Sequence, residues 1–132
     1  MHRNPSRPMS PHLTIWRWGP HMLVSILHRV TGSGLAVVGM AAMTWWLVAI
    51  ASGPEAYETF MSWAKWWPGM VVFIGLVWAF WQHLFSGLRH FVMDMGAGYE
   101  LKTNKFWAVM TIVAGLAATG ATVAWVLWGR GL

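Results

Sequence analysis

The stretch "WWPGMVVFIGLVWAFWQHLFSGL", from Trp66 to Leu88, runs for 23 residues without an Asp, Glu, Lys or Arg. About 20 apolar residues are enough for an α-helix to cross the hydrocarbon core of a bilayer. Two more uncharged stretches occur, Val30 to Pro54 with 25 residues and Phe106 to Gly129 with 24. Because unpaired backbone groups are costly in lipid, an open chain crosses it only as helices. The sequence therefore predicts an all-α membrane protein with three transmembrane helices, at about residues 20–51, 68–95 and 106–128.

The composition excludes a small soluble domain. Of the 132 residues, 57% are hydrophobic and only 10% are charged, which is more apolar surface than a chain of this length can bury. The chain has no cysteine, so it forms no disulfide and no thiolate-held metal or iron–sulfur site. Any redox centre on it needs other ligands.

The charges predict the topology. Seven of the nine Lys and Arg residues fall on one side of the expected helices: Arg3, Arg7, Arg17, Arg29, Arg89, Lys102 and Lys105. Since basic residues accumulate on the cytoplasmic side, we expect a cytoplasmic N-terminus and an external C-terminus. The net charge of +5 then needs no nucleic-acid partner. Residues 1–19 are expected to form a proline-broken cytoplasmic arm, not a signal or transit peptide, and residues 20–132 a single membrane domain.

Polar residues interrupt the second span at its cytoplasmic end, in "HLFSGLRHFVMDMG", residues 83–96. On a helix turning about 100° per residue, four of them fall within about 40° of one line: His83, Gly87, His90 and Asp94. Arg89 points elsewhere. A polar stripe inside a membrane must face protein, cofactor or water.

The first span carries a matching cluster, "SILHRVTG", residues 25–32. Ser25, Arg29 and Gly32 share one face of the expected helix, and His28 lies beside them. Both clusters lie toward the cytoplasmic ends of antiparallel neighbours, so we expect them at similar depth and in one shared site. Three helices bury few faces, so we also expect the chain to be part of a hetero-oligomeric helix bundle with further membrane proteins.

A neutral imidazole within a bilayer is a suitable axial ligand for haem iron, and no other metal-ligand pattern is visible. Haem propionates need cationic or N–H donors near the membrane surface, which His28, Arg29 and His90 are placed to supply. Gly87 would leave room for a flat macrocycle, or serve helix packing alone. A serine hydroxyl beside an arginine also suits a quinone carbonyl.

Each polar residue has a structural alternative. A lone membrane histidine such as His83 is often only an interhelical hydrogen-bonding group. Arg29 and Arg89 could extend to lipid phosphates, and Ser25 could hydrogen-bond its own helix. Asp94 could simply pair with either arginine. The coincidence of two clusters at one depth favours a shared site.

Two other classes of function fit parts of the sequence. A small ion or drug transporter usually needs a carboxylate deep in a span, and this chain has none there. A purely structural anchor without haem could use the same helices. A reduced absorption spectrum distinguishes these classes.

Two long motifs resemble one known family: "RPMSPHLTIWRWGPHMLVSILHRVTG", residues 7–32, and "HLFSGLRHFVMDMG", residues 83–96. They are similar to those of the cytochrome b556 membrane anchors of succinate dehydrogenase (respiratory complex II). The resemblance covers nearly the whole chain. It implies a haem b-binding anchor that binds no succinate itself and serves electron transport and the tricarboxylic acid cycle. Because the sequence shows no presequence, we expect a bacterial inner membrane in preference to a mitochondrial one.

The resemblance also implies residue roles. His83 matches the axial ligand of haem b, with the other axial histidine supplied by a second membrane anchor subunit, and His28, Arg29 and His90 would lie by the propionates. Depth alone leaves open His28 as an intrachain second ligand, which the family pattern rejects. Ubiquinone would contact Ser25, Ile26 and Arg29, and protons would pass Asp94 and Glu100. The flavoprotein and iron–sulfur subunits would be partners, the latter touching the "RPMSPHL" arm and the inner loop.

Overall fold

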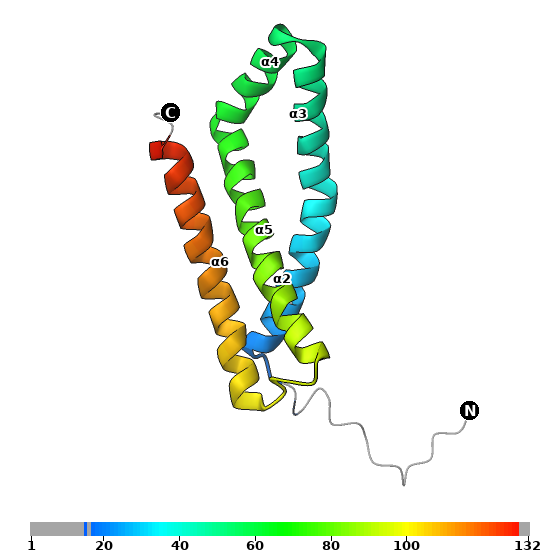
Figure 1. Ribbon diagram of the computed structural model, residues 1–132, viewed down its shortest axis with the longest axis vertical. Helices are drawn as coiled ribbons and strands as arrows, with labels where there is room; N and C mark the ends of the chain where they lie inside the picture. The colour runs from blue at the N-terminus through cyan, green and yellow to red at the C-terminus, as the bar shows by residue number, and fades with distance from the viewer. Residues whose placement is uncertain (1–14, 16, 130–132) are drawn as a thin grey trace, which may run out of the picture.

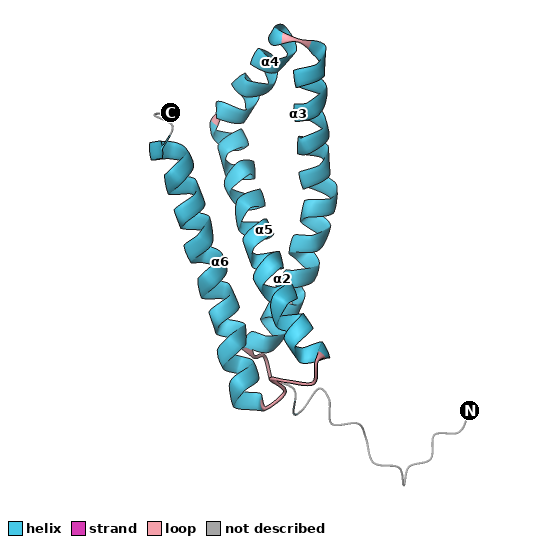
Figure 2. Cartoon of the chain, viewed as in Figure 1, coloured by secondary structure: helices cyan, strands magenta, loops and turns pink. Residues whose placement is uncertain are grey.

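The computed structural model describes residue 15 and residues 17–129. Over this part the chain is helical and contains no strand (Figure 2). The elements follow in the order α2 (Pro20–Gly34), η1 (Leu35–Gly39), α3 (Met40–Ser52), α4 (Pro54–Lys65), α5 (Trp67–Asp94) and α6 (Leu101–Gly129). Most of the expected N-terminal arm lies outside the described residues.

Three helices are long and apolar enough to cross a membrane, as predicted. The first is continuous over Pro20–Ser52, because α2, a π-helical turn (η1) and α3 follow one another without a break. The others are α5 and α6, with 28 and 29 residues. At 1.5 Å per residue each of the three exceeds the roughly 30 Å of the hydrocarbon core. The all-α fold with three spans is confirmed, and its orientation in the membrane stays a prediction.

The connection between α5 and α6, called the inner connection because we expect it on the cytoplasmic side, is shorter than predicted. The reason is that α6 begins at Leu101 and not near residue 106. The carbonyl of Glu100 accepts the backbone N–H of Asn104 at 2.8 Å, and its carboxylate accepts the Thr103 hydroxyl at 3.2 Å. The first bond is a regular i→i−4 bond that opens the helix, and the second links the Glu100 side chain to the first turn. The polar segment "LKTNK", residues 101–105, is therefore helical although it looks like a loop by composition.

The connection between α3 and α5 is itself helical. Residues 55–65, which lie outside the three predicted spans, belong to the 12-residue helix α4. Pro54 occupies its first turn, where the missing N–H costs nothing. Glu55 in the first turn and Lys65 in the last complement the helix dipole. Three exposed tryptophans cluster where α4 meets α5: Trp63, Trp66 and Trp67.

The helices pack most closely at one end of the molecule. There α2, α5 and α6 all contact one another, whereas α3 contacts α4 and η1 (Figure 1). The face of α6 toward the other helices carries small residues at helical spacing: Ala108, Thr111, Gly115 and Thr119. Ala117 and Ala121 of the same helix are exposed. The polar clusters of the first two spans therefore lie in the packed half of the fold.

Candidate functional site

The contact between α2 and α5 brings the two polar clusters together, as their expected depth predicted. The imidazole rings of His28 and His83 stack, with centroids 3.9 Å apart and planes inclined by 8°. His90 lies against His28 at 5.1 Å, with its ring tilted by 58°. Three histidines from two helices thus form one cluster inside the packed half of the molecule.

The ring of His83 is held by groups of α2. Its Nδ1 lies 3.0 Å from the carbonyl oxygen of His28 and 3.2 Å from Oγ1 of Thr31. A carbonyl only accepts hydrogen bonds, so this geometry places the proton on Nδ1. The other nitrogen, Nε2, is then left with its lone pair, which is the form of imidazole that binds a metal.

Gly32 makes room for this ring. A Cβ built at Gly32 would lie 2.8 Å from Cε1 of His83 and 3.3 Å from its Nδ1. Any larger residue would push the imidazole away from its partners. Gly32 therefore sets the close approach of α2 and α5 at the histidine cluster.

The ring of His28 is held from the opposite helix. Its Nδ1 lies 2.7 Å from Oγ of Ser86, a fully buried hydroxyl that also contacts the carbonyl of Gln82 at 2.7 Å. Because a hydroxyl both donates and accepts, this bond does not fix the tautomer of His28. A Cβ at Gly87 would lie 3.6 Å from Cε1 of His28, an ordinary contact, so the space beside Gly87 adjoins that ring.

The stacking of the two rings tests the alternative in which His28 and His83 are both axial ligands of one haem iron. Two axial ligands of one iron point their lone pairs at each other from opposite sides of the metal. The rings of His28 and His83 are parallel and overlapping instead, so their nitrogens do not face one another across a gap. In this conformation the two residues do not form an axial pair.

The three residues that we expect to contact a quinone lie on a partly exposed flank of α2. Arg29 is exposed, Ile26 is 44% exposed and Ser25 is half-buried. Within residues 17–129 the hydroxyl of Ser25 makes no hydrogen bond, so it does not bond back to its own helix. The hydroxyl of Thr31 does so, because it donates to the carbonyl oxygen of Leu27 at 2.7 Å. The flank is therefore available to another molecule.

The acidic residues lie at the end of α5 and the start of α6. Asp94 is the last residue of α5, Glu100 directly precedes α6, and both are exposed. The alternative in which Asp94 pairs with an arginine is not formed in the described structure. Arg89 turns to α6 and donates to Oδ1 of Asn104 at 2.8 Å. This agrees with the prediction that Arg89 faces away from the histidine stripe.

Sequence reasoning gave no role to Thr31 or Ser86, the two hydroxyls that hold the histidine rings. Their spacing was the available signal, because each lies three residues after a histidine and so one helical turn from it. Among the described residues no group of three or more His, Asp or Glu side chains is placed to hold a metal ion. A single imidazole with a free Nε2 fits a haem iron, whose four equatorial ligands come from the porphyrin.

Fold and site together define a three-span membrane protein with an imidazole cluster between its first two spans. The chain belongs to the succinate dehydrogenase/fumarate reductase transmembrane subunit family, whose model matches residues 3–122. It is 40% identical over 97 residues to the succinate dehydrogenase cytochrome b556 subunit of Paracoccus denitrificans, covering 74% of each chain. It is 33% identical over 136 positions to the cytochrome b560 subunit of Reclinomonas americana, covering 95% of this chain and 88% of that one. The human mitochondrial cytochrome b560 subunit is 30% identical over 128 positions, covering 86% of this chain and 71% of the relative.

Proposed function

We propose that this chain is the haem b-binding membrane anchor of a succinate:quinone oxidoreductase and forms one wall of its ubiquinone-reduction site. The observation that carries the proposal is the orientation of His83. Its Nδ1 is bonded to the carbonyl of His28, which leaves Nε2 as a lone-pair donor in the packed part of the membrane domain. The cytochrome names of the relatives point the same way.

His83 would supply one axial ligand, and a histidine of a second membrane anchor subunit the other. Bound haem b exchanges single electrons. The backbone carbonyl of His28 orients the ring of His83 and makes its Nε2 more basic. His28, Arg29 and His90 would donate to the propionates.

Ser25, Ile26 and Arg29 would contact the quinone ring. The hydroxyl of Ser25 and the guanidinium of Arg29 donate to its carbonyl oxygens, and Ile26 covers its apolar face. A fixed positive charge in a low dielectric stabilises negative charge that develops on the substrate during reduction. Asp94 and Glu100 are exposed at the inner helix ends, where they would pass protons from the aqueous side.

The remaining surface suits an anchor. Large apolar side chains are exposed along the whole length of the spans, for lipid and for the second anchor subunit. The iron–sulfur subunit would dock on the cytoplasmic side, against residues 7–13 and the connection before α6, and would deliver electrons from succinate oxidised on the flavoprotein. In this arrangement the N-terminus would face the cytoplasm and the complex would lie in a bacterial inner membrane.

The test uses the complex purified in mild detergent with its partner subunits. We expect a b-type α-band after dithionite reduction, and loss of the low-spin band in His83→Ala. His21→Ala is the matched control, because His21 lies on α2 outside the histidine cluster, and this variant should keep the spectrum. An assembled complex without haem, or one whose spectrum survives His83→Ala, would contradict the proposal.

A further inference from the structure

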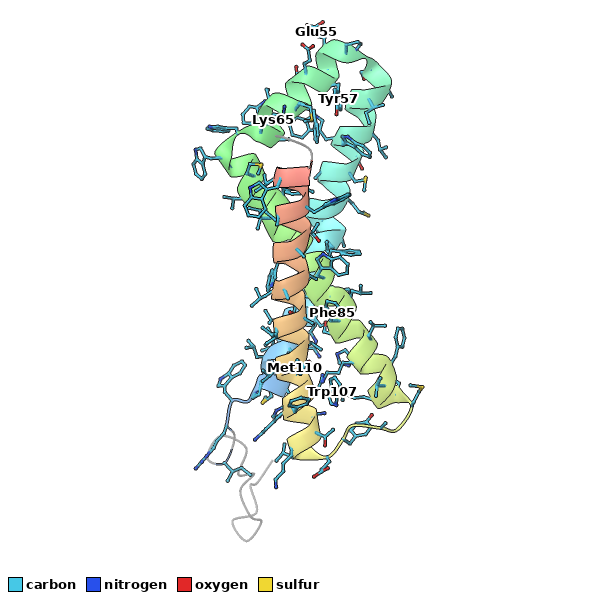
Figure 3. All side chains as sticks on the ribbon, turned by 60° about the vertical axis from the view of Figure 1, so that its left-hand side comes forward. Glu55, Tyr57, Lys65, Phe85, Trp107 and Met110 are labelled. Carbon is cyan, nitrogen blue, oxygen red and sulfur yellow. The ribbon has the colours of Figure 1, made fainter. Side chains whose placement is uncertain are left out.

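A pocket of about 520 Å³ lies between α5 and α6 at the end where the inner connection joins them. Its walls are almost entirely apolar, with Phe85 and Val92 from α5 and Trp107, Met110 and Ala114 from α6. Figure 3 labels three of these side chains, Phe85, Met110 and Trp107, near the crossing of the two helices. The wall of α6 runs from Thr103 to Ala114, about 16 Å along the helix axis. That length suits an extended hydrocarbon chain of about a dozen carbons.

Among the described residues that line this pocket, Arg89 is the charged one. It is only 9% exposed, and its hydrogen-bond partner within residues 17–129 is the neutral carboxamide of Asn104 at 2.8 Å. No carboxylate of the described residues pairs with it. A buried charge without a counter-charge is costly, so this guanidinium calls for an anion.

The neighbours of Arg89 hold it at the connection end of the pocket. Nδ2 of Asn104 donates to the carbonyl of Gly98 at 3.2 Å and lies 3.8 Å from Sδ of Met93. The amide is thereby oriented with its oxygen toward Arg89, whose other N–H groups stay free for a ligand. Lys102 and Lys105 are exposed in the first two turns of α6 and add positive charge near the same end.

We propose that this pocket binds one anionic phospholipid of the leaflet on the side of the inner connection. The phosphate accepts hydrogen bonds from Arg89, and one acyl chain extends along α6 toward Ala114. The pocket is polar at one end and apolar along the rest, which matches the polarity of a phospholipid. The lysines at the start of α6 favour a net negative headgroup over a zwitterionic one.

This site is separate from the haem and quinone residues. Arg89 and the pocket face α6, whereas His83 and Gly87 face α2. The sequence motif around His83 includes Arg89, yet nothing in the proposed redox function uses it. A bound phospholipid gives this arginine a counter-charge and fills the space between α5 and α6.

The test is native mass spectrometry of the intact delipidated complex with added phosphatidylglycerol or phosphatidylcholine. We expect one phosphatidylglycerol to bind in preference to phosphatidylcholine. Arg89→Gln should weaken phosphatidylglycerol binding about tenfold, the value of a buried charge-assisted hydrogen bond, and reduce the preference. Lys65→Gln is the matched control, since it removes an exposed positive charge on α4 that does not line the pocket, and it should keep the affinity and the preference.

A second pair of variants tests the same site in case Arg89→Gln does not fold. Ala114→Phe fills the deep end of the pocket with Arg89 intact and should abolish the bound lipid, whereas Leu116→Phe on the exposed face of α6 should not. Equal binding of both lipids, or binding unchanged by Ala114→Phe, overturns the proposal. Two other results would also overturn the proposal, because each gives the pocket another occupant. One is a purified complex that retains a quinone which Ala114→Phe displaces. The other is a complex in which Ala114 is buried against a helix of a partner subunit.

Discussion

His28 and His83 hold each other in place across the contact of α2 and α5. The carbonyl of His28 accepts a hydrogen bond from Nδ1 of His83 at 3.0 Å, while the two rings stack 3.9 Å apart. The bond to a backbone carbonyl fixes the tautomer of His83, and the bond of His28 to a hydroxyl does not fix its own. The two histidines are therefore not equivalent.

This asymmetry predicts different spectra for two single substitutions. His28→Ala removes a side chain but keeps the backbone carbonyl that orients His83, so low-spin haem should remain, with a changed midpoint potential. His83→Ala should remove the low-spin band. Absorption and electron paramagnetic resonance spectra of the oxidised complex measure both. Loss of six-coordinate haem in His28→Ala would instead favour an intrachain pair of ligands.

Gly32 and Gly34 provide a matched pair of substitutions on one helix. In Gly32→Ala the new Cβ would lie 2.8 Å from Cε1 of His83, so the ring must move and its bond to the carbonyl of His28 weakens. A Cβ at Gly34 meets nothing within 4 Å. We expect lower haem content per purified complex in Gly32→Ala and wild-type content in Gly34→Ala. Equal haem content in both variants would mean that His83 is not held as described.

The proposed quinone site predicts that substitutions there impair quinone reduction but not succinate oxidation. Arg29→Leu removes a charged donor and should lower succinate:ubiquinone reductase activity about ten- to a hundredfold, and Ser25→Ala removes a neutral one and should cost about two- to tenfold. Succinate oxidation by a soluble artificial acceptor should stay near wild type in both.

Ser33→Ala is the control for these two variants, because Ser33 is exposed on the same helix and outside the proposed site. It should leave both activities intact. If quinone reduction survives Arg29→Leu and Ser25→Ala unchanged, these residues do not contact the quinone.

The sequence predicted the spans because their determinant is local: an uncharged run of sufficient length becomes a helix in lipid wherever it lies. The pairing of the clusters at residues 25–32 and 83–96 followed from antiparallel topology and depth. The start of α6 at Leu101 did not follow, since it depends on hydrogen bonds of Glu100 with Asn104 and Thr103. Composition alone assigns such polar residues to a loop.

The finer geometry of the site depends on which faces of two helices meet. The hydroxyl partners of the histidines were missed because Thr31 and Ser86 each act on a ring of the opposite helix. Helical periodicity places residues on a face but does not set the rotation of one helix against the next. The turn of Arg89 toward Asn104 is likewise a property of the packing of α5 on α6.

The contact of α5 with α6 contains a buried amide without partners. Gln82 is 0% exposed, and neither its Nε2 nor its Oε1 has a hydrogen-bond partner in the described structure. An unsatisfied buried polar group costs about 1–3 kcal/mol, so Gln82→Met, which nearly conserves volume, should raise the free energy of unfolding by about that amount. Thermal denaturation of the purified complex measures the change. A loss of stability would show that another subunit or water binds the amide.

Gly115 lies directly opposite Gln82 and gives the second half of this prediction. A Cβ at Gly115 would lie 2.8 Å from Oε1 of Gln82, so Gly115→Ala should destabilise the complex, whereas Gly120→Ala on the same helix meets nothing within 4 Å and should not. In a Gln82→Ala background the crowded oxygen is absent. The nearest remaining neighbour of the Cβ at position 115 is then Cα of residue 82, at 3.4 Å. The penalty of Gly115→Ala should then fall, giving a coupling energy of about 1 kcal/mol in a double-mutant cycle. Additive effects would mean that α5 and α6 do not meet at these two residues.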